Sequence, residues 1–452
     1  MNIVYLIISL LLYFFAPTKY NLIFCNVVTI LFLVQTIPFI LKRSQKNYVN
    51  FHTIFFLSFF FTNFFYPTVL YPINPEFFSV FTLPFDDNYI NKGTALAQLA
   101  TSSFILGASK IKAYSNANNN FIRSTFISHK YATYITVFLF GLFLLTVGRN
   151  FLAGDFTGHS TVSLYILQLL TCSFVLAPII FFRDFGFQKK KKIFYTVTAC
   201  YIFLFVSIGD RGPALYLLIL LVGLYTFYVK NIALKYIIVF GLIGVVGMHL
   251  IGLGRTTDTT DAEGNVITRG LERTRSDEQF QSYYAITQSF VVNTRNLYVG
   301  LEYVDENGIN LGKTYMSSIL GVIPFAQSAV ENLTGIELEG SAGFFTTLAF
   351  GKYRSYGLGT NLVADVFISF GLFGVIILFL LFGRTVELFR KKTFIKNDIY
   401  SNIVYFTLLS YSVYYPRTGL LMPLKFIIWT YVIYLLLRKF KLLKPKLIFK
   451  QL

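Results

Sequence analysis

The sequence YIIVFGLIGVVGMHLIGL (residues 236–253) is followed directly by GRTTDTTDAEGN (residues 254–265). The first stretch has no charged residue and approaches the roughly 20 apolar residues that a helix needs to cross a bilayer. The second stretch is rich in Thr, Asp and Gly, which is typical of turns. We therefore expect a membrane-spanning helix to end at this junction and a polar segment to begin.

The polar segment extends to Leu358 and interrupts a chain that is otherwise apolar. The sequence is 55% hydrophobic and 19% aromatic, with a mean hydropathy of +0.61, which excludes the soluble classes. We predict an all-α polytopic integral membrane protein with about twelve transmembrane helices. The twelve apolar stretches are 2–16, 20–41, 51–70, 93–109, 131–148, 162–182, 193–208, 213–229, 236–253, 361–383, 400–414 and 419–437.

This pattern divides the chain into three parts: nine spans in 1–253, one large loop in 254–358, and three spans with a basic tail in 359–452. The loop is expected to be partly helical. Ser276 and Gln279 have the spacing of a capping box, which predicts a helix that starts there and continues past Tyr298. Two apolar stretches in the loop, Met316 to Phe325 and Gly343 to Phe350, are too short to span and are expected to be re-entrant or interfacial.

The distribution of basic residues predicts the orientation. With a cytoplasmic N-terminus, the short loops and the tail on that side hold 25 of the 39 basic residues but only 3 of the 21 acidic ones. Lys and Arg are enriched in cytoplasmic loops of membrane proteins. Both termini are therefore expected in the cytoplasm and the large loop outside. The net charge of +18 indicates topology and contact with membrane lipids, and no nucleic-acid partner.

Cysteine and histidine give no sign of a metal site or a disulfide. Cys25, Cys172 and Cys200 lie inside apolar spans, and the four His residues lack the spacing of metal ligands. We predict no metal and no cofactor.

Ionisable residues in or beside the spans are the candidates for a functional site, because a charge at the centre of a membrane helix costs about 2.5–3.5 kcal/mol. Asp365 lies about one turn into the tenth span. It shares a helix face with Asn361 and Ser369, because these residues are four apart. Such a polar stripe must face the bundle or a water-filled cavity. Hydrogen bonding between helices is the structural alternative to catalysis.

Two Arg residues at the outer boundary are placed by their local sequence. Arg211 lies in the tight turn Asp210-Arg211-Gly212-Pro213, and Pro213 can begin the next helix. Pairing with Asp210 or snorkelling is the simpler interpretation of Arg211. Arg295 falls on the inward face of the predicted loop helix, and pairing with Glu302 is its simpler interpretation.

Further cations are predicted at the same outer rim. A cluster of Arg residues suits a polyanionic lipid headgroup, because the planar guanidinium group binds phosphate oxygens in a bidentate manner. The sequence therefore predicts an anion-binding site. The remaining candidates are Arg149, Arg255, Arg354, Arg417 and Lys425.

The layout of the whole chain resembles the Wzy-type O-antigen polymerases, of the oligosaccharide repeat unit polymerase group. The shared features are about twelve spans, cytoplasmic ends and one long outer loop late in the sequence. Two local motifs add to the resemblance: the turn Gly209–Gly212, and Gly357-Leu-Gly-Thr-Asn361 leading through Asp365 to Phe370–Gly374. In related families a His-Asn pair stands where this chain has Thr360-Asn361, so no His base is carried over.

The resemblance implies a GT-C-like membrane glycosyltransferase in the bacterial inner membrane, with its large loop in the periplasm. It would polymerise oligosaccharide repeat units carried on undecaprenyl pyrophosphate, with a chain-length regulator and a flippase as partners. Asp365, or secondly Glu339, would accept the proton of the acceptor hydroxyl. Arg211 and the other rim cations would stabilise the leaving pyrophosphate. An O-antigen ligase and a lipid-linked oligosaccharide flippase are the alternative functions.

Overall fold

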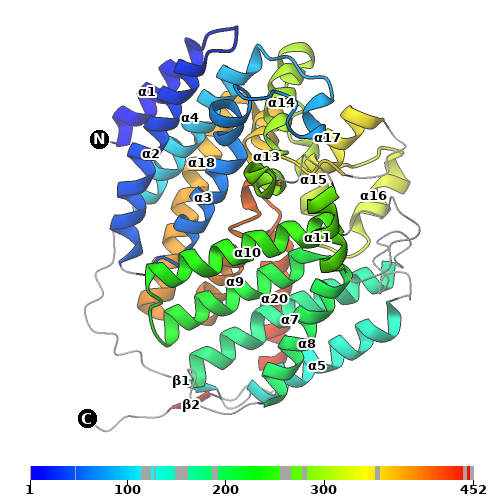
Figure 1. The fold of residues 1–452 in the computed structure, drawn as a ribbon. Helices are drawn as coiled ribbons and strands as arrows, with labels where there is room; N and C mark the ends of the chain where they lie inside the picture. Colours follow the sequence, from blue (N-terminus) through cyan, green and yellow to red (C-terminus); the bar gives the residue numbers. More distant parts are fainter. Residues whose placement is uncertain are drawn as a thin grey trace.

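A computed structural model describes residues 2–45, 47–112, 124–126, 129–147, 161–185, 192–254, 266–276, 282–351, 357–440 and 445–447. These residues are helical almost throughout (Figure 1), so the all-α class is confirmed. One antiparallel pair of short strands, β1 (Ser124–Phe126) and β2 (Pro445–Leu447), is the exception within the described residues.

Each of the twelve apolar stretches contains a helix. The helices before the polar segment are α1 (Asn2–Phe14), α2 (Leu22–Ser44), α3 (Phe51–Asn63), α4 (Tyr89–Ser109), α5 (His129–Thr146), α7 (Thr161–Phe185), α8 (Lys192–Ile208), α9 (Arg211–Tyr228) and α10 (Leu234–Gly254), with short helical turns at Tyr66–Leu70 and Ser79–Thr82. Those after it are α18 (Leu362–Lys396), α19 (Ile399–Tyr411) and α20 (Leu424–Lys439), with a turn at Tyr415–Arg417.

Five of the described helices are long enough and apolar enough to cross a membrane: α2, α7, α9, α10 and α18. Others, such as α1 and α3 with 13 residues each, are shorter than the roughly 20 residues that a bilayer requires. The structure thus provides several helices that suit a membrane, and the number of twelve spans stays a prediction.

The polar segment contains short helices rather than one long one: α11 (Val266–Ser276), α13 (Gln288–Val291), α14 (Thr294–Asn307), α15 (Lys313–Leu320), α16 (Ala326–Thr334) and α17 (Ser341–Phe350), with a turn at Tyr283–Thr287. Figure 1 shows α13 to α17 gathered at the upper right, which we call the loop end. The Lys- and Arg-bearing ends of α2 and α18 lie toward the opposite side, which we call the basic end.

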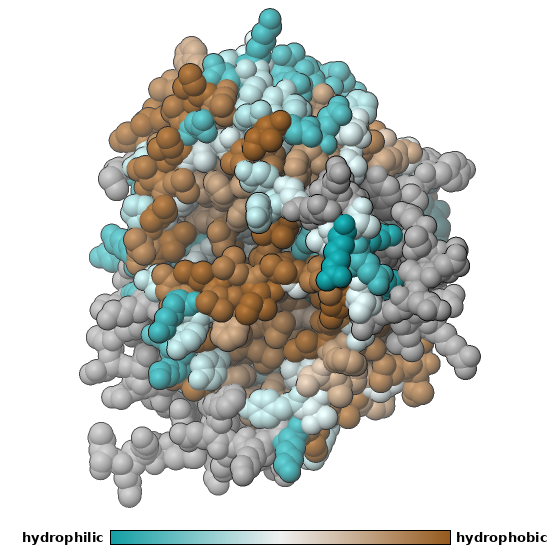
Figure 2. All heavy atoms as spheres, in the orientation of Figure 1, coloured by the Kyte–Doolittle hydropathy of each residue, from teal (hydrophilic) through white to brown (hydrophobic). Residues whose placement is uncertain are grey.

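The surface between these ends is largely apolar. Figure 2 shows hydrophobic side chains over α1 and α2 and in a band across α10, while hydrophilic ones gather at the top of the view. In the most apolar part of α10 only 22% of the residues are buried. An apolar helix that is exposed on most sides fits a lipid environment better than water.

The single helix predicted from Ser276 past Tyr298 is not observed: its first turn, 277–281, lies outside the described residues, and the turn at Tyr283–Thr287, α13 and α14 follow. Ser276 itself is the last residue of α11, which folds back along α10. Glycine makes the reversal possible: a Cβ on Gly254 would lie 1.7 Å from the Val266 carbonyl oxygen, and one on Gly270 would lie 2.1 Å from that of Leu250. Residues 256–265, predicted as turns, and 277–281 lie outside the described residues.

Helices α4 and α18 form the most extensive helix contact of the fold, and two glycines set their separation. A Cβ on Gly107 of α4 would lie 1.9 Å from the Leu380 carbonyl oxygen, and one on Gly383 of α18 would lie 2.0 Å from that of Phe104. Small residues allow the backbones of membrane helices to approach this closely. Any larger residue must push the helices apart.

We expect Gly383→Ala to destabilise the protein by about 1–3 kcal/mol, because the added methyl group meets a backbone carbonyl that cannot rotate away. Thermal unfolding of the purified protein in detergent measures this. Gly141→Ala in α5 is the matched control, because nothing lies within 4 Å of a Cβ there. Equal melting temperatures for the two variants would contradict the importance of the α4–α18 contact.

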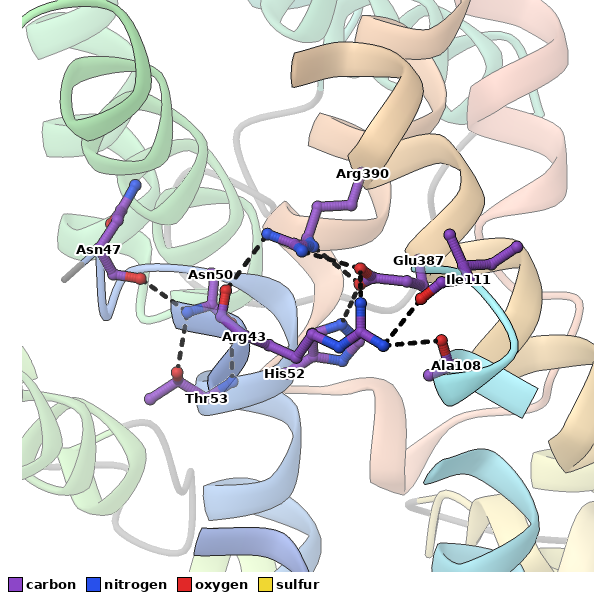
Figure 3. A network of polar contacts seen from close by, with 9 residues as sticks. All are labelled: Arg43, Asn47, Asn50, His52, Thr53, Ala108, Ile111, Glu387 and Arg390. Atoms are coloured by element: carbon purple, nitrogen blue, oxygen red, sulfur yellow. Dashed lines mark hydrogen bonds and ion pairs between the residues drawn. The ribbon is translucent and has the colours of Figure 1, made fainter. Parts of the chain in front are cut away.

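A buried ionic cluster joins the same helices near the basic end (Figure 3). Glu387 of α18 accepts two hydrogen bonds from Arg390, both 2.8 Å, and one of 2.6 Å from Arg43 of α2. His52 of α3 lies 2.9 Å from the same carboxylate, and Arg43 also donates to the Ala108 carbonyl oxygen of α4. Both Glu387 and His52 have an exposed fraction of 0%.

Arg43, Glu387 and Arg390 are among the charges that the sequence analysis counted in the cytoplasmic connectors, and the structure places all three inside the helix bundle. The structure buries them because α2 continues to Ser44 and α18 to Lys396, beyond the apolar stretches. Two guanidinium groups satisfy the single carboxylate. Removing one partner of such a group leaves a buried charge uncompensated.

We predict that Glu387→Gln lowers the free energy of unfolding by about 3–5 kcal/mol, because Arg43 and Arg390 then remain buried without an anion. Arg384→Gln, one turn earlier on the exposed face of α18, should change stability little. Chemical unfolding of both variants tests the difference. A small effect at Glu387 would mean that water compensates the two arginines.

Candidate functional site

The first turn of α18 carries the predicted polar stripe to the loop end. Asn361 caps the helix, since its Oδ1 accepts hydrogen bonds from the Val363 and Ala364 backbone N–H groups at 2.9 and 3.3 Å. Asn361, Asp365 and Ser369 are all buried, so the stripe faces the bundle. The prediction of a shared inward face is therefore confirmed.

Asp365 is enclosed by the hairpin between α19 and α20. Its Oδ2 accepts a hydrogen bond of 2.9 Å from the Leu420 backbone N–H. Gly419 lies so close that a Cβ there would be 3.3 Å from this oxygen. The hydroxyl groups of Ser341 and Tyr315, from the polar segment, also face the carboxylate. Three parts of the chain thus meet at one buried carboxylate.

Arg417 lies on the same hairpin, three residues before Leu420. Its Nε donates a hydrogen bond of 2.8 Å to Asn293 Oδ1, and its guanidinium carbon lies 5.4 Å from the centre of the Tyr414 ring. Its Nη1 is buried and has no hydrogen-bond partner among the described residues. Burial lowers the pKa of Arg417 to about 10, so the side chain is still a cation at neutral pH.

Arg211 approaches Arg417 from the start of α9. The positive charge of Arg211 contributes, after burial, to the lowered pKa of Arg417. The Nη1 of Arg211 donates to the Met248 carbonyl oxygen of α10. A Cβ on Gly252 would lie 2.6 Å from this nitrogen, so glycine makes room for the side chain. Asp210 caps α9 by accepting from the Gly212 N–H. The structure therefore brings two predicted cations together.

Other predicted site residues lie elsewhere. Arg295 is 3% exposed and donates to the backbone carbonyl oxygens of Leu83 and Pro84 at 3.3 and 2.5 Å, which fixes the connection between α3 and α4. Glu339 lies two residues before Ser341, and its carboxylate accepts a hydrogen bond of 3.0 Å from the Thr347 hydroxyl. Arg149, Arg255 and Arg354 lie outside the described residues.

Lys425, an intramembrane cation for which an anionic partner would be expected, contacts two aromatic rings instead among the described residues. Its Nζ lies 4.7 Å from the centre of the Trp429 ring and 5.3 Å from that of Tyr165. No carboxylate in the described part of the chain forms an ion pair with it. Two aromatic faces replace the expected anion, because aromatic rings attract cations through their quadrupole.

The sequence analysis missed Asn293, Tyr315 and Ser341. Nothing in the local sequence marks these neutral polar residues, which reach the site only through the packing of the polar segment. Asn293 links the Arg417 side chain to the backbone at Leu358. Its Oδ1 accepts a hydrogen bond from Arg417, and its Nδ2 donates one of 2.8 Å to the Leu358 carbonyl oxygen. The arrangement offers a proton acceptor, Asp365, which contacts the hairpin at Leu420, and a cation on the same hairpin, Arg417, whose Nη1 has no hydrogen-bond partner among the described residues.

Comparison with known proteins adds no relative: no family model, curated protein or solved structure matches this chain.

We expect Asn361→Ala to lower stability by about 1–2 kcal/mol, because α18 loses its N-cap. The substitution also removes the 2.9 Å hydrogen bond from Asn361 Nδ2 to Asn63 of α3. Thermal unfolding measures the loss. The control is Asn307→Ala at the exposed end of α14, whose side chain bonds only within its own helix. An effect no larger than that of the control would contradict the capping role.

Proposed function

We propose that this protein is a membrane glycosyltransferase that polymerises oligosaccharide repeat units carried on undecaprenyl pyrophosphate. One observation supports this proposal most directly: a buried carboxylate, Asp365, and a half-buried cation, Arg417, whose Nη1 has no hydrogen-bond partner among the described residues, are held by the same hairpin at the loop end. A transferase that expels pyrophosphate needs both a proton acceptor and a group that stabilises developing negative charge.

In the proposed reaction, a hydroxyl oxygen of the acceptor sugar attacks the anomeric carbon of the donor sugar. The bond between that carbon and the pyrophosphate oxygen breaks, and its electron pair leaves with undecaprenyl pyrophosphate. Asp365 takes the proton of the attacking hydroxyl. Arg417, with Arg211 beside it, stabilises the charge on the departing pyrophosphate. Electrons and protons balance without a further reactant.

The surroundings of Asp365 place a condition on this mechanism. The carboxylate is 3% exposed and is covered by the Gly419–Leu420 backbone, Tyr315 and Ser341. An acceptor hydroxyl reaches it only if α15 and α17, which carry Tyr315 and Ser341, separate from the hairpin. The polar segment would then act as the cover of the site.

The proposed setting is the bacterial inner membrane, with the loop end in the periplasm and both termini in the cytoplasm. The excess of Lys and Arg in the connectors supports this orientation. The donor and acceptor would reach the site from the outer leaflet, where the loop end meets the membrane.

A gene deletion with complementation tests the function. In a strain that lacks this protein, we expect surface polysaccharide to be limited to a single repeat unit, and wild type to restore the ladder on a gel. Asp365→Asn should fail to restore it, because the amide cannot accept the proton. Arg417→Gln should also fail, because the cation is lost.

The control is Arg275→Gln, an exposed cation on α11, which should restore the ladder in full. Each variant must be present in the membrane at the level of wild type. An unchanged ladder in the deletion strain would refute the polymerase. Loss of even the single-repeat band would indicate a ligase or a flippase.

A further inference from the structure

Lys425 lies in a second group of side chains at the loop end, which we call the aromatic-lysine site: Lys425, Trp429, Tyr165 and Phe325. The rings of Tyr165 and Trp429 are nearly parallel, at 18° with centres 6.1 Å apart, and Lys425 Nζ lies within 5.3 Å of both centres. The Phe325 ring packs 5.1 Å from that of Tyr165. Three distant segments of sequence build this site.

Hydrogen bonds fix the orientation of both rings. Trp429 Nε1 donates 2.7 Å to the Val322 carbonyl oxygen, and the Phe325 backbone N–H donates 3.1 Å to the Tyr165 hydroxyl. Phe325 has a φ of 63°, which a bulky residue rarely adopts, yet its side chain is 64% exposed. Strain that leaves a large aromatic side chain uncovered is more typical of a binding site than of a packed core.

The electrostatics of the site favour an anion. Lys425 is the second residue of α20, and a helix N-terminus carries a partial positive charge that disfavours a nearby cation. No carboxylate among the described residues compensates for it. An anionic group beside Lys425 would be attracted by both the ammonium group and the helix terminus.

Apolar surface continues from this cation along the exposed sides of two helices. Ile428 and Val432 follow Lys425 by three and seven residues, so they lie on the same face of α20. They are 36% and 45% exposed, and Val162 at the start of α7 is 62% exposed. A ligand with a charged head and a long hydrocarbon chain would match both parts of this surface.

From these observations we infer that the aromatic-lysine site binds the diphosphate group and first isoprene units of a polyprenyl diphosphate. Its role rests on the proposed function: polymerisation joins two lipid-linked substrates, and each needs a place for its diphosphate. Lys425 and Arg417 have no contact residue in common. We therefore assign the two diphosphates to separate places: that of the donor to Arg417 and Arg211, as in the proposed reaction, and that of the acceptor to Lys425.

Trp429 reports on this site directly, because it is the only tryptophan of the chain. We expect undecaprenyl pyrophosphate, added to the full-length protein in nanodiscs, to produce a saturable change in tryptophan fluorescence. Lys425→Gln should weaken the apparent affinity by about tenfold, as expected for the loss of one charge-assisted contact. Lys425→Arg should retain most of it. Lys439→Gln, at the other end of the same helix, should match wild type.

Control ligands identify the chemistry. Undecaprenol and inorganic pyrophosphate should each give a much weaker response, because each supplies only half of the ligand. A response of equal size to phosphatidylglycerol would overturn the inference, since the site would then bind an ordinary phospholipid. A flat titration, or full affinity in Lys425→Gln, would also overturn it. Melting temperatures of the variants show whether they are folded.

Native mass spectrometry tests the two-site arrangement. At a ligand concentration that half-saturates the Trp429 response, the complex with two molecules of undecaprenyl pyrophosphate should be populated in wild type and largely lost in Lys425→Gln; equal populations in both proteins would refute this arrangement. The result is independent of the polysaccharide gel. If the fluorescence change depends on Lys425 but the deletion strain still makes the full polysaccharide ladder, the binding site stands and the polymerase is rejected. If the deletion strain loses the ladder but undecaprenyl pyrophosphate gives no fluorescence change, the polymerase stands and this site is rejected.

Discussion

The close contact between α4 and α18 is the constraint on which the rest of the structure depends. Gly107 and Gly383 bring the two backbones into contact, and Glu387 then ties α18 to α2, α3 and α4 through Arg43 and His52. A buried carboxylate shared by two guanidinium groups tolerates little displacement, because a broken partner leaves a charge unpaired. The positions of the N-terminal helices and α18 relative to one another are therefore fixed.

The packing of α18 near the basic end also affects the loop end of this helix. The same helix that carries Glu387 near the basic end carries Asp365 near the loop end, so the position of Asp365 is set by packing far from it. Gly371, with a φ of 64°, bends the helix between them. The polar segment and the hairpin before α20 then close around the carboxylate. The candidate site is thus built on the first part of α18, before the kink at Gly371, and is covered by shorter elements.

The two cations Arg417 and Lys425, which flank the turn before α20 in sequence, have different surroundings. Arg417 is held by Asn293 and lies beside Arg211. Lys425 is held between aromatic rings at the edge of an exposed apolar face. In the proposed reaction each of the two lipid-linked substrates needs an anion-binding site, and these two cations are our candidates for them.

The sequence by itself determined the helices, because long apolar runs leave the backbone no other way to satisfy its hydrogen bonds in lipid. It also determined the inward stripe of Asn361 and Asp365, since a spacing of four fixes a helix face. Tertiary structure alone decided what meets these residues. No local sequence pattern marks Asn293, Tyr315 and Ser341. Lys425 contacts aromatic rings instead of an anion. Glu387 is buried because the helices around it continue past their apolar stretches. Local patterns specify which face of a helix is polar, whereas partners depend on contacts between residues far apart in the chain.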